Sequence, residues 1–139
     1  MSNILPPDVL RGATLRGNEY GWEVSSFPKA LMSAETGGYA CLGGQFQFRL
    51  GDGGTCEMYW LNADSESRDP EEPWAEYSRR SCREVLSKFH EAVSATDFKK
   101  EATNWPAIQI NPISALVFVA YFVTEAELAE ISVNGYRLN

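Results

Sequence analysis

The sequence holds only one histidine, His90, and three cysteines, Cys41, Cys56 and Cys82, among its 139 residues. A zinc site needs three or four histidine, cysteine or carboxylate ligands, usually in local pairs, and His90 and Cys82 stand eight residues apart. The odd number and wide spacing of the cysteines match no disulfide framework. We therefore expect reduced, buried thiols, a reducing cytosol, and no metal or other cofactor.

Catalytic and phosphate-binding motifs are also missing. His90 has no serine or cysteine partner at a recognisable motif spacing, and the stretches LGGQF and GDGGT match neither GxGxxG nor GxxxxGKS/T. An EF-hand loop starting at Asp64 is excluded, because Asp69 and Ala75 occupy the positions that need glycine and glutamate. We expect no catalytic residue and a protein that is not an enzyme, while a looser calcium or magnesium site in this acidic region stays open.

The sequence has neither a long apolar run nor an excess of basic residues. Its longest apolar run, at residues 115–123, has nine residues, and a membrane helix needs about 20. The N-terminus lacks a basic segment followed by an apolar one, so we expect no secretory signal and a soluble, cytoplasmic protein. Nineteen Asp and Glu against twelve Lys and Arg disfavour nucleic acid and anionic membranes as partners.

The net charge of -7 is concentrated in one short segment. Residues 64–76 hold six carboxylates and one cation, Arg68, and therefore carry -5. Residues 1–63 carry -2, and residues 77–139 are neutral overall. Such a distribution favours either a basic partner or a segment that is simply solvated.

The hydrophobic pattern predicts an α+β fold in a single globular domain, residues 1–139, with residues 1–17 as an irregular N-terminal arm. Apolar residues at three- and four-residue spacing predict a long amphipathic helix at about 73–94. Residues 115–123, apolar on both faces, predict a central strand. Both should pack with a small, mostly antiparallel sheet and shorter helices. The shorter elements are a strand near residues 20–24, helices within 25–38 and 95–106, and a C-terminal helix that begins at a Thr124–Glu127 capping box and ends at Asn134-Gly135.

Alternating apolar and polar residues predict a hairpin over residues 39–50 and 55–63. A three-residue loop, Asp52-Gly53-Gly54, with Gly54 in the left-handed conformation, brings the apolar faces of the two strands together. The predicted pairs are Leu50 with Cys56, Phe48 with Met58, Phe46 with Trp60 and, on the polar face, Arg49 with Glu57.

The acidic segment is the candidate partner-binding site. Its carboxylates next to the long helix suit the positive end of the helix dipole, which explains Glu71 and Glu72 structurally. That explanation does not extend to Asp64, Glu66 and Asp69. Aromatic residues beside a carboxylate cluster are typical of a protein-binding surface with an acidic rim. The predicted contact residues are Asp64, Glu66, Asp69, Glu71, Glu72, Trp74, Glu76 and Tyr77.

A small, acidic α+β protein without catalytic motifs resembles, in size, charge and architecture, the bacterial immunity proteins of polymorphic-toxin and contact-dependent-inhibition systems. Those proteins often neutralise basic nuclease toxins by covering the active site with an acidic surface. The resemblance implies a cytosolic inhibitor that acts by occlusion and catalyses nothing.

Two other interpretations stay open. The chain could be a small enzyme or ligand-binding domain, with a pocket between the hairpin sheet and the long helix. It could also be a structural subunit or a homodimer that uses an exposed strand edge. The polar residues that the pocket interpretation would use are Gln45, Gln47, Arg49, Glu57, Tyr59 and His90.

Overall fold

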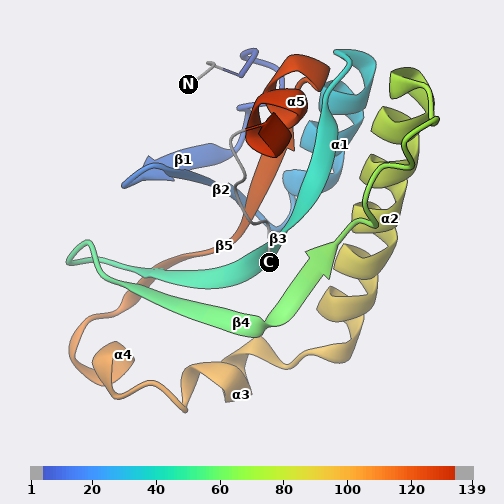
Figure 1. The fold of residues 1–139 in the computed structure, drawn as a ribbon. Helices are drawn as coiled ribbons and strands as arrows, with labels where there is room; N and C mark the ends of the chain where they lie inside the picture. The colour runs from blue at the N-terminus through green and yellow to red at the C-terminus, as the bar shows by residue number, and fades with distance from the viewer. Residues whose placement is uncertain (1–4, 134–139) are drawn as a thin grey trace.

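A computed structural model describes residues 5–133 of the chain and confirms the predicted α+β fold. Within these residues, five antiparallel strands form one open sheet in the order β1-β2-β5-β3-β4, so β5, the last of the five in the sequence, lies at the centre. The elements, labelled in Figure 1, are β1 (Ala13–Arg16), β2 (Glu19–Glu23), α1 (Phe27–Thr36), β3 (Ala40–Leu50), β4 (Thr55–Asp64), α2 (Trp74–Ala95), α3 (Phe98–Ala102), α4 (Pro106–Ile110), β5 (Ile113–Val123) and α5 (Glu125–Val133).

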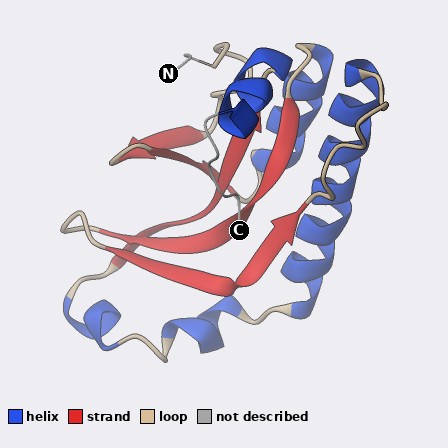
Figure 2. Ribbon diagram, in the orientation of Figure 1, coloured by secondary structure: helices blue, strands red, loops and turns tan. Residues whose placement is uncertain are grey.

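Helices α1 and α2 cover one face of the sheet, and the main core lies between them and the strands (Figure 2). Aromatic rings from β2, β3, β5, α1 and α2 meet there. The ring centres of Phe27 and Phe118 are 4.6 Å apart, and those of Phe46 and Phe89 are 5.5 Å apart. Fully burying a side chain of this size contributes about 1.5–3 kcal/mol, so the apolar stripe of α2 fixes that helix on the sheet.

Strand β5 pairs with β2 on one side and β3 on the other, as expected for the predicted central strand. Its middle residues Val117, Phe118 and Val119 are fully buried. The predicted capping box is present at the start of α5, where the Glu127 N–H donates to Thr124 Oγ1 at 3.2 Å and the Thr124 N–H donates to Glu127 Oε1 at 2.8 Å. The turn predicted at Asn134-Gly135 lies outside the described residues.

Part of the segment predicted as an irregular arm is regular. Strand β1 pairs with β2, with Ala13 opposite Trp22, and Gly17 turns the chain with a φ of 63°. Arg49 of β3 joins this hairpin to the rest of the sheet by donating to the Thr14 carbonyl at 2.7 Å. The prediction of an arm extending to residue 17 is therefore wrong, because a strand of four residues shows too little alternation to be distinguished from a loop.

The β3–β4 hairpin differs from its predicted register by two residues. Phe48 lies opposite Cys56, and Phe46 lies opposite Met58. The turn takes in residues 51–54, and Gly53, with a φ of 98°, adopts the left-handed conformation that was predicted for Gly54. A shift of two residues keeps every side chain on its original face, so the hydrophobic pattern could not distinguish the two registers.

A register shift between Gln45 and Phe46 places residues 59–61 in an irregular part of β4. Trp60 was predicted to face the core, but it is 57% exposed and stacks on Trp105 with ring centres 6.3 Å apart. The bulge breaks the two-residue alternation on which that prediction depended.

Candidate functional site

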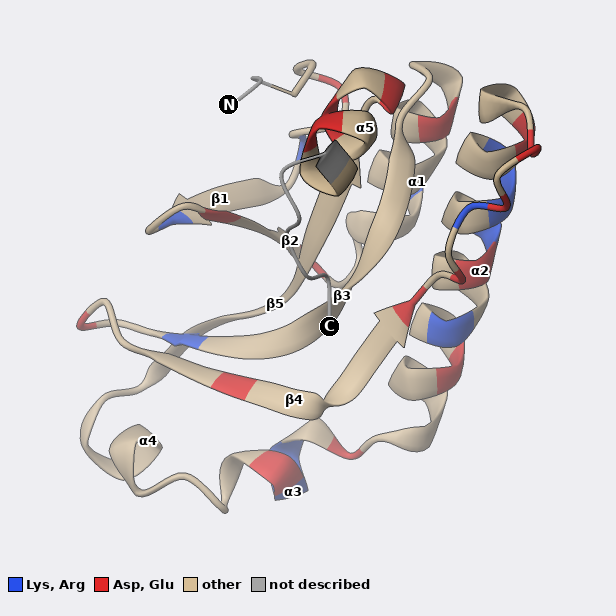
Figure 3. Ribbon diagram, viewed as in Figure 1, with Lys and Arg blue, Asp and Glu red and all other residues tan. Residues whose placement is uncertain are grey.

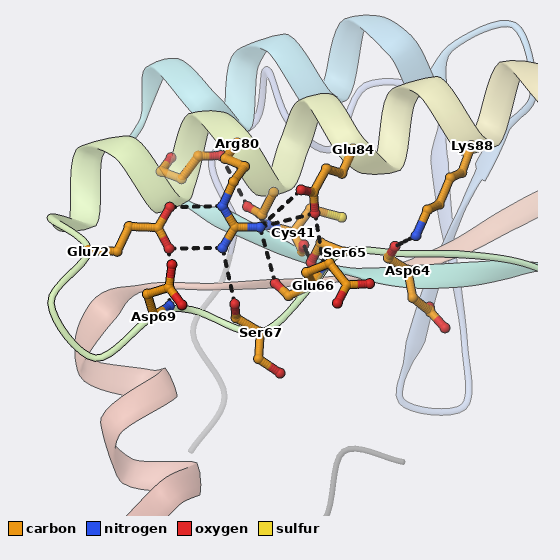
Figure 4. Close-up of polar contacts among 12 residues, drawn as sticks. Cys41, Asp64, Ser65, Glu66, Ser67, Asp69, Glu72, Arg80, Glu84 and Lys88 are labelled. Atoms are coloured by element: carbon orange, nitrogen blue, oxygen red, sulfur yellow. Dashed lines mark hydrogen bonds and ion pairs between the residues drawn. The ribbon is translucent and has the colours of Figure 1, made fainter.

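The acidic connection between β4 and α2, residues 64–73, lies against α2 and is called the acidic strap below. At its start, the Ser65 hydroxyl donates to the Cys41 carbonyl of β3 at 2.7 Å. The Lys88 ammonium group on α2 donates to the Asp64 carbonyl at 2.6 Å. The strap is therefore attached to both the sheet and the helix before it reaches its most acidic part (Figure 4).

Arg80, on α2, forms most of the contacts that hold the strap (Figure 4). Its Nε and Nη2 donate to the two carboxylate oxygens of Glu72, both at 2.8 Å, and its Nη1 donates to Glu84 at 3.1 Å. It also donates to the main-chain carbonyls of Ser67, at 3.1 Å, and Glu66, at 3.4 Å. The Arg80 and Glu72 side chains are 30% and 12% exposed, so this bidentate pair is largely shielded from water.

The two carboxylates bound by Arg80 also hold the backbone of the strap. Glu84 accepts a hydrogen bond from the Glu66 N–H at 2.8 Å, and Glu72 accepts one from the Asp69 N–H at 3.2 Å. Each carboxylate thus connects the guanidinium group to a main-chain amide. Arg80 therefore determines the conformation of the strap as well as reducing its charge.

These contacts change the acid–base behaviour of Glu72. The hydrogen bonds from Arg80 lower the pKa of the Glu72 carboxyl from 4.5 to about 2, although burial partly opposes the shift. The pKa of Arg80 rises in return, mainly because of its bonds to Glu72. Glu72 was predicted to contact a partner, but in the structure both of its carboxylate oxygens accept hydrogen bonds from Arg80.

Arg68, the cation within the strap, is paired as well. Its Nη2 lies 3.0 Å from the carboxylate of Glu125 on α5, and its Nε donates to the Glu72 carbonyl at 3.0 Å. The guanidinium carbon is 5.2 Å from the centre of the Trp74 ring, within cation–π range. The Trp74 indole N–H donates to the Gly38 carbonyl at 2.7 Å. Trp74, a predicted contact residue, is half-buried and makes these contacts within the protein.

Tyr77, another predicted contact residue, is 2% exposed and belongs to the core with Ala40 and Val123. Its side chain is almost entirely buried, so it offers a partner very little contact surface. The apolar stripe of α2 that buries Val85 also includes Tyr77, and helical periodicity turns both toward the sheet. The part of the site prediction that relied on Tyr77 is wrong for this reason.

The remaining predicted contact residues form an exposed acidic surface. Within residues 5–133, none of their carboxylate groups has a hydrogen-bond or ion-pair partner. Figure 3 shows acidic residues along the strap and basic residues on the adjoining helix α2. These exposed residues are Asp64, Glu66, Asp69, Glu71 and Glu76.

A groove of about 1420 Å³ opens beside the strap. The sheet contributes Gln45 and Tyr121 to its lining. These residues alternate along their strands with the core residues Phe46 and Ala120, so their side chains project from the face opposite α1 and α2. The strap and α5 form the sides, and charged lining residues include Glu19, Asp64, Arg68, Asp69, Glu127 and Glu130.

The pocket predicted by the second interpretation has a different location. The space between the hairpin and α2 is filled by core residues such as Phe46 and Phe89. Two of the six candidate polar residues, Gln45 and Tyr59, line the groove on the other face. The others are not in its lining: His90 is exposed on α2, Glu57 is half-buried, and Gln47 and Arg49 are buried in the sheet.

Two tyrosines in the groove donate hydrogen bonds to carboxylates. The Tyr121 hydroxyl donates to Glu19 Oε2, and the Tyr59 hydroxyl donates to Glu57 Oε2 at 3.4 Å. Gln45 Nε2 donates to the other oxygen of Glu57 at 3.0 Å. The pKa of Tyr121 is raised, first by burial and then by Glu19, and the charge of Glu57 raises it further. Glu19 and Glu57 therefore belong to one cluster with Gln45, Tyr59 and Tyr121. The sequence analysis indicated neither Glu19 nor Tyr121.

The three cysteines are buried and free, and burial raises the pKa of Cys82 to about 12. In the part of the chain that the structure describes, no three His, Cys, Asp or Glu side chains are grouped so that they could hold a metal ion. None of the helices in this part has both the length and the apolar character needed to cross a bilayer. No protein-family model, curated protein or solved structure matches this chain.

Proposed function

We propose that this protein binds a basic protein partner through the exposed carboxylates of the acidic strap, in the cytosol and without catalysing a reaction. Binding covers a basic site on the partner and blocks it, in the manner of the immunity proteins that the chain resembles. The contact residues are Asp64, Glu66, Asp69 and Glu71 of the strap, together with Glu76 in the first turn of α2.

The observation that supports this proposal is the contrast between the paired and unpaired charges of the strap. Arg80 is bonded to Glu72 and Glu84, and Arg68 is bonded to Glu125. The exposed carboxylates have no such partner among the described residues. Unpaired charges of one sign on a fixed segment repel each other, and a basic partner relieves that repulsion while gaining attraction of its own.

The way in which the strap is held favours tight binding. Arg80, Glu72 and Glu84 bond to the main chain at Glu66, Ser67 and Asp69. Because the backbone is fixed before the partner arrives, association loses less conformational entropy than it would with a disordered loop. The negative charge also steers a basic protein toward the strap and raises the association rate at low salt.

A charge-reversal experiment tests the proposal. The partner is first captured from the native cell with the immobilised protein, and its affinity is then measured by calorimetry. The triple variant Asp64→Lys, Glu66→Lys, Asp69→Lys should bind about a hundredfold more weakly at low salt while its Tm stays close to that of the unmodified protein.

The matched control changes the net charge by the same amount elsewhere. Asp8, Glu23 and Glu91 are exposed and make no side-chain hydrogen bond or ion pair among the described residues. Replacing all three with lysine should reduce affinity far less than the strap variant does. Equal losses in the two triple variants would show that only net charge matters, and an unchanged affinity in the strap variant would refute the proposal.

A further inference from the structure

The groove beside the strap is strongly acidic. Apart from Glu127, whose carboxylate caps α5, its lining contains four carboxylates, from Glu19, Asp64, Asp69 and Glu130, and one guanidinium group, from Arg68. Arg68 is already paired with Glu125. The groove therefore presents an excess of negative charge to whatever enters it, and low-dielectric walls strengthen that field.

Aromatic rings lie among these carboxylates. Tyr59 is 63% exposed and Tyr121 is 42% exposed, so both present ring surface to solvent. Their hydroxyl groups point to Glu57 and Glu19 and donate to them. Ring faces next to carboxylates suit a guanidinium group, which stacks on an aromatic ring and donates in a planar fork to carboxylate oxygens.

The groove is continuous with the acidic strap. Asp64 and Asp69 belong to the exposed carboxylates of the strap and also line the groove. Gly43, on β3, allows this arrangement, because a Cβ atom there would lie 2.2 Å from Asp64 Oδ1. A partner that contacts Asp64 and Asp69 therefore also lies at the groove.

We propose that the groove receives an extended, arginine-containing segment of the basic partner, with one guanidinium group placed between Tyr59 and Tyr121 and bonded to Glu19. This inference rests on the proposed function, and it adds where the partner inserts and which side chain it uses. The volume also favours a segment of polypeptide, because about 1420 Å³ exceeds the roughly 300–1,000 Å³ of small-molecule pockets.

The test uses the full chain and a fluorescein-labelled peptide of alternating arginine and glycine, with a peptide in which citrulline replaces arginine as the neutral control. Binding is measured by fluorescence anisotropy and mapped by NMR of the backbone amides. We expect saturable binding of the arginine peptide, little binding of the citrulline peptide, and shifts of the Gly43, Gly44 and Tyr121 amides.

Variants that leave the fold unchanged test the individual groups. Glu19→Gln keeps the size of the side chain but removes its charge, and it should weaken binding of the arginine peptide about tenfold. Glu23→Gln is the matched control, because Glu23 is exposed on the same strand and does not line the groove. It should leave the affinity unchanged. Tyr59→Leu should also weaken binding, since it removes the ring on which the guanidinium group stacks.

The outcomes separate this inference from the proposed function. If the NMR shifts are confined to residues 66–72 and Glu19→Gln binds the peptide as tightly as the unmodified chain, the peptide does not bind in the groove. The strap then remains the binding surface. If the arginine peptide still binds in the groove of the triple strap variant, the proposal that the strap is the binding surface loses its support. If free arginine binds as tightly as the peptide, the groove is a small-molecule site. If the peptide binds only after residues 134–139 are removed, the chain's own C-terminal segment is the occupant. Either result overturns the proposal.

Discussion

Replacing Arg80 with alanine should release the acidic strap from α2 and leave the rest of the fold in place. The guanidinium group binds two carboxylates, and these accept hydrogen bonds from the main-chain N–H groups of Glu66 and Asp69. Without Arg80, the two carboxylates repel each other and no longer hold these amides in position. The strap then gains conformational freedom, although none of its own residues has changed.

The size of the effect follows from the exposure of Arg80. Exposed ion pairs contribute about 0–1 kcal/mol, and breaking a buried pair costs about 3–5 kcal/mol. The Arg80 side chain is 30% exposed, which places it between these limits and subjects it to screening by salt. We expect Arg80→Ala to lower the free energy of unfolding by about 2 kcal/mol, and by less at high salt.

Hydrogen exchange of single amides is the decisive assay, because it separates local release from global destabilisation. In Arg80→Ala, the Glu66 and Asp69 amides should exchange at least about tenfold faster, while amides at the centre of β5 change only with global stability. Arg79→Ala is the matched control, since Arg79 is exposed and makes no side-chain bond among the described residues. Unaltered exchange at Glu66 and Asp69 in Arg80→Ala would refute our account of how the strap is held.

The folded-state pKa of Glu72 is lowered from 4.5 to about 2, so the carboxylate's contribution to stability is fully present above pH 4.5 and is lost as the pH falls toward 2. An NMR titration of the Glu72 carboxyl carbon should give a pKa of about 2. A value near 4.5 would contradict the bidentate pair with Arg80. Gly44→Ala should destabilise the protein by about 3 kcal/mol or prevent folding, because the new Cβ would lie 2.1 Å from the Val119 carbonyl oxygen. In Gly51→Ala, the control, the atom nearest to the new Cβ is 3.8 Å away, so a denaturant titration should show little change in stability. Cys82 should resist an exposed-thiol reagent at neutral pH until the chain unfolds, and rapid labelling of the native protein would contradict its burial and raised pKa.

Most of the fold could be predicted because its elements have long periodic patterns. The apolar stripe of α2 and the continuous apolar run of β5 each specify one kind of element. The hairpin register could not be predicted, because a two-residue shift leaves the same side chains on the same face. The exposure of Trp60 depends on a bulge, which interrupts the alternation without leaving a clear signal in the sequence.

The candidate site was predicted only in part, for a similar reason. The excess of carboxylates at residues 64–76 is visible in the sequence, but the pairing of Arg80 with Glu72 joins residues eight positions apart across the start of a helix. Local spacing rules pair Arg80 with Glu76 and Glu84, and the structure has the second pair together with Glu72. The groove combines Glu19 with Tyr121, which are 102 positions apart, so only the three-dimensional fold brings them together.

The central position of β5 has a consequence for how the protein forms during synthesis. Strands β2 and β3 do not pair with each other; each pairs with β5, which follows both in the sequence and leaves the ribosome after them. Until then, the two hairpins share no hydrogen-bonded ladder, and both keep an open edge next to an uncovered apolar face. The nascent chain is therefore vulnerable to aggregation until β5 has been synthesised. A synthetic peptide covering residues 106–133 should complement a separately made fragment of residues 1–105 by inserting as its missing strand.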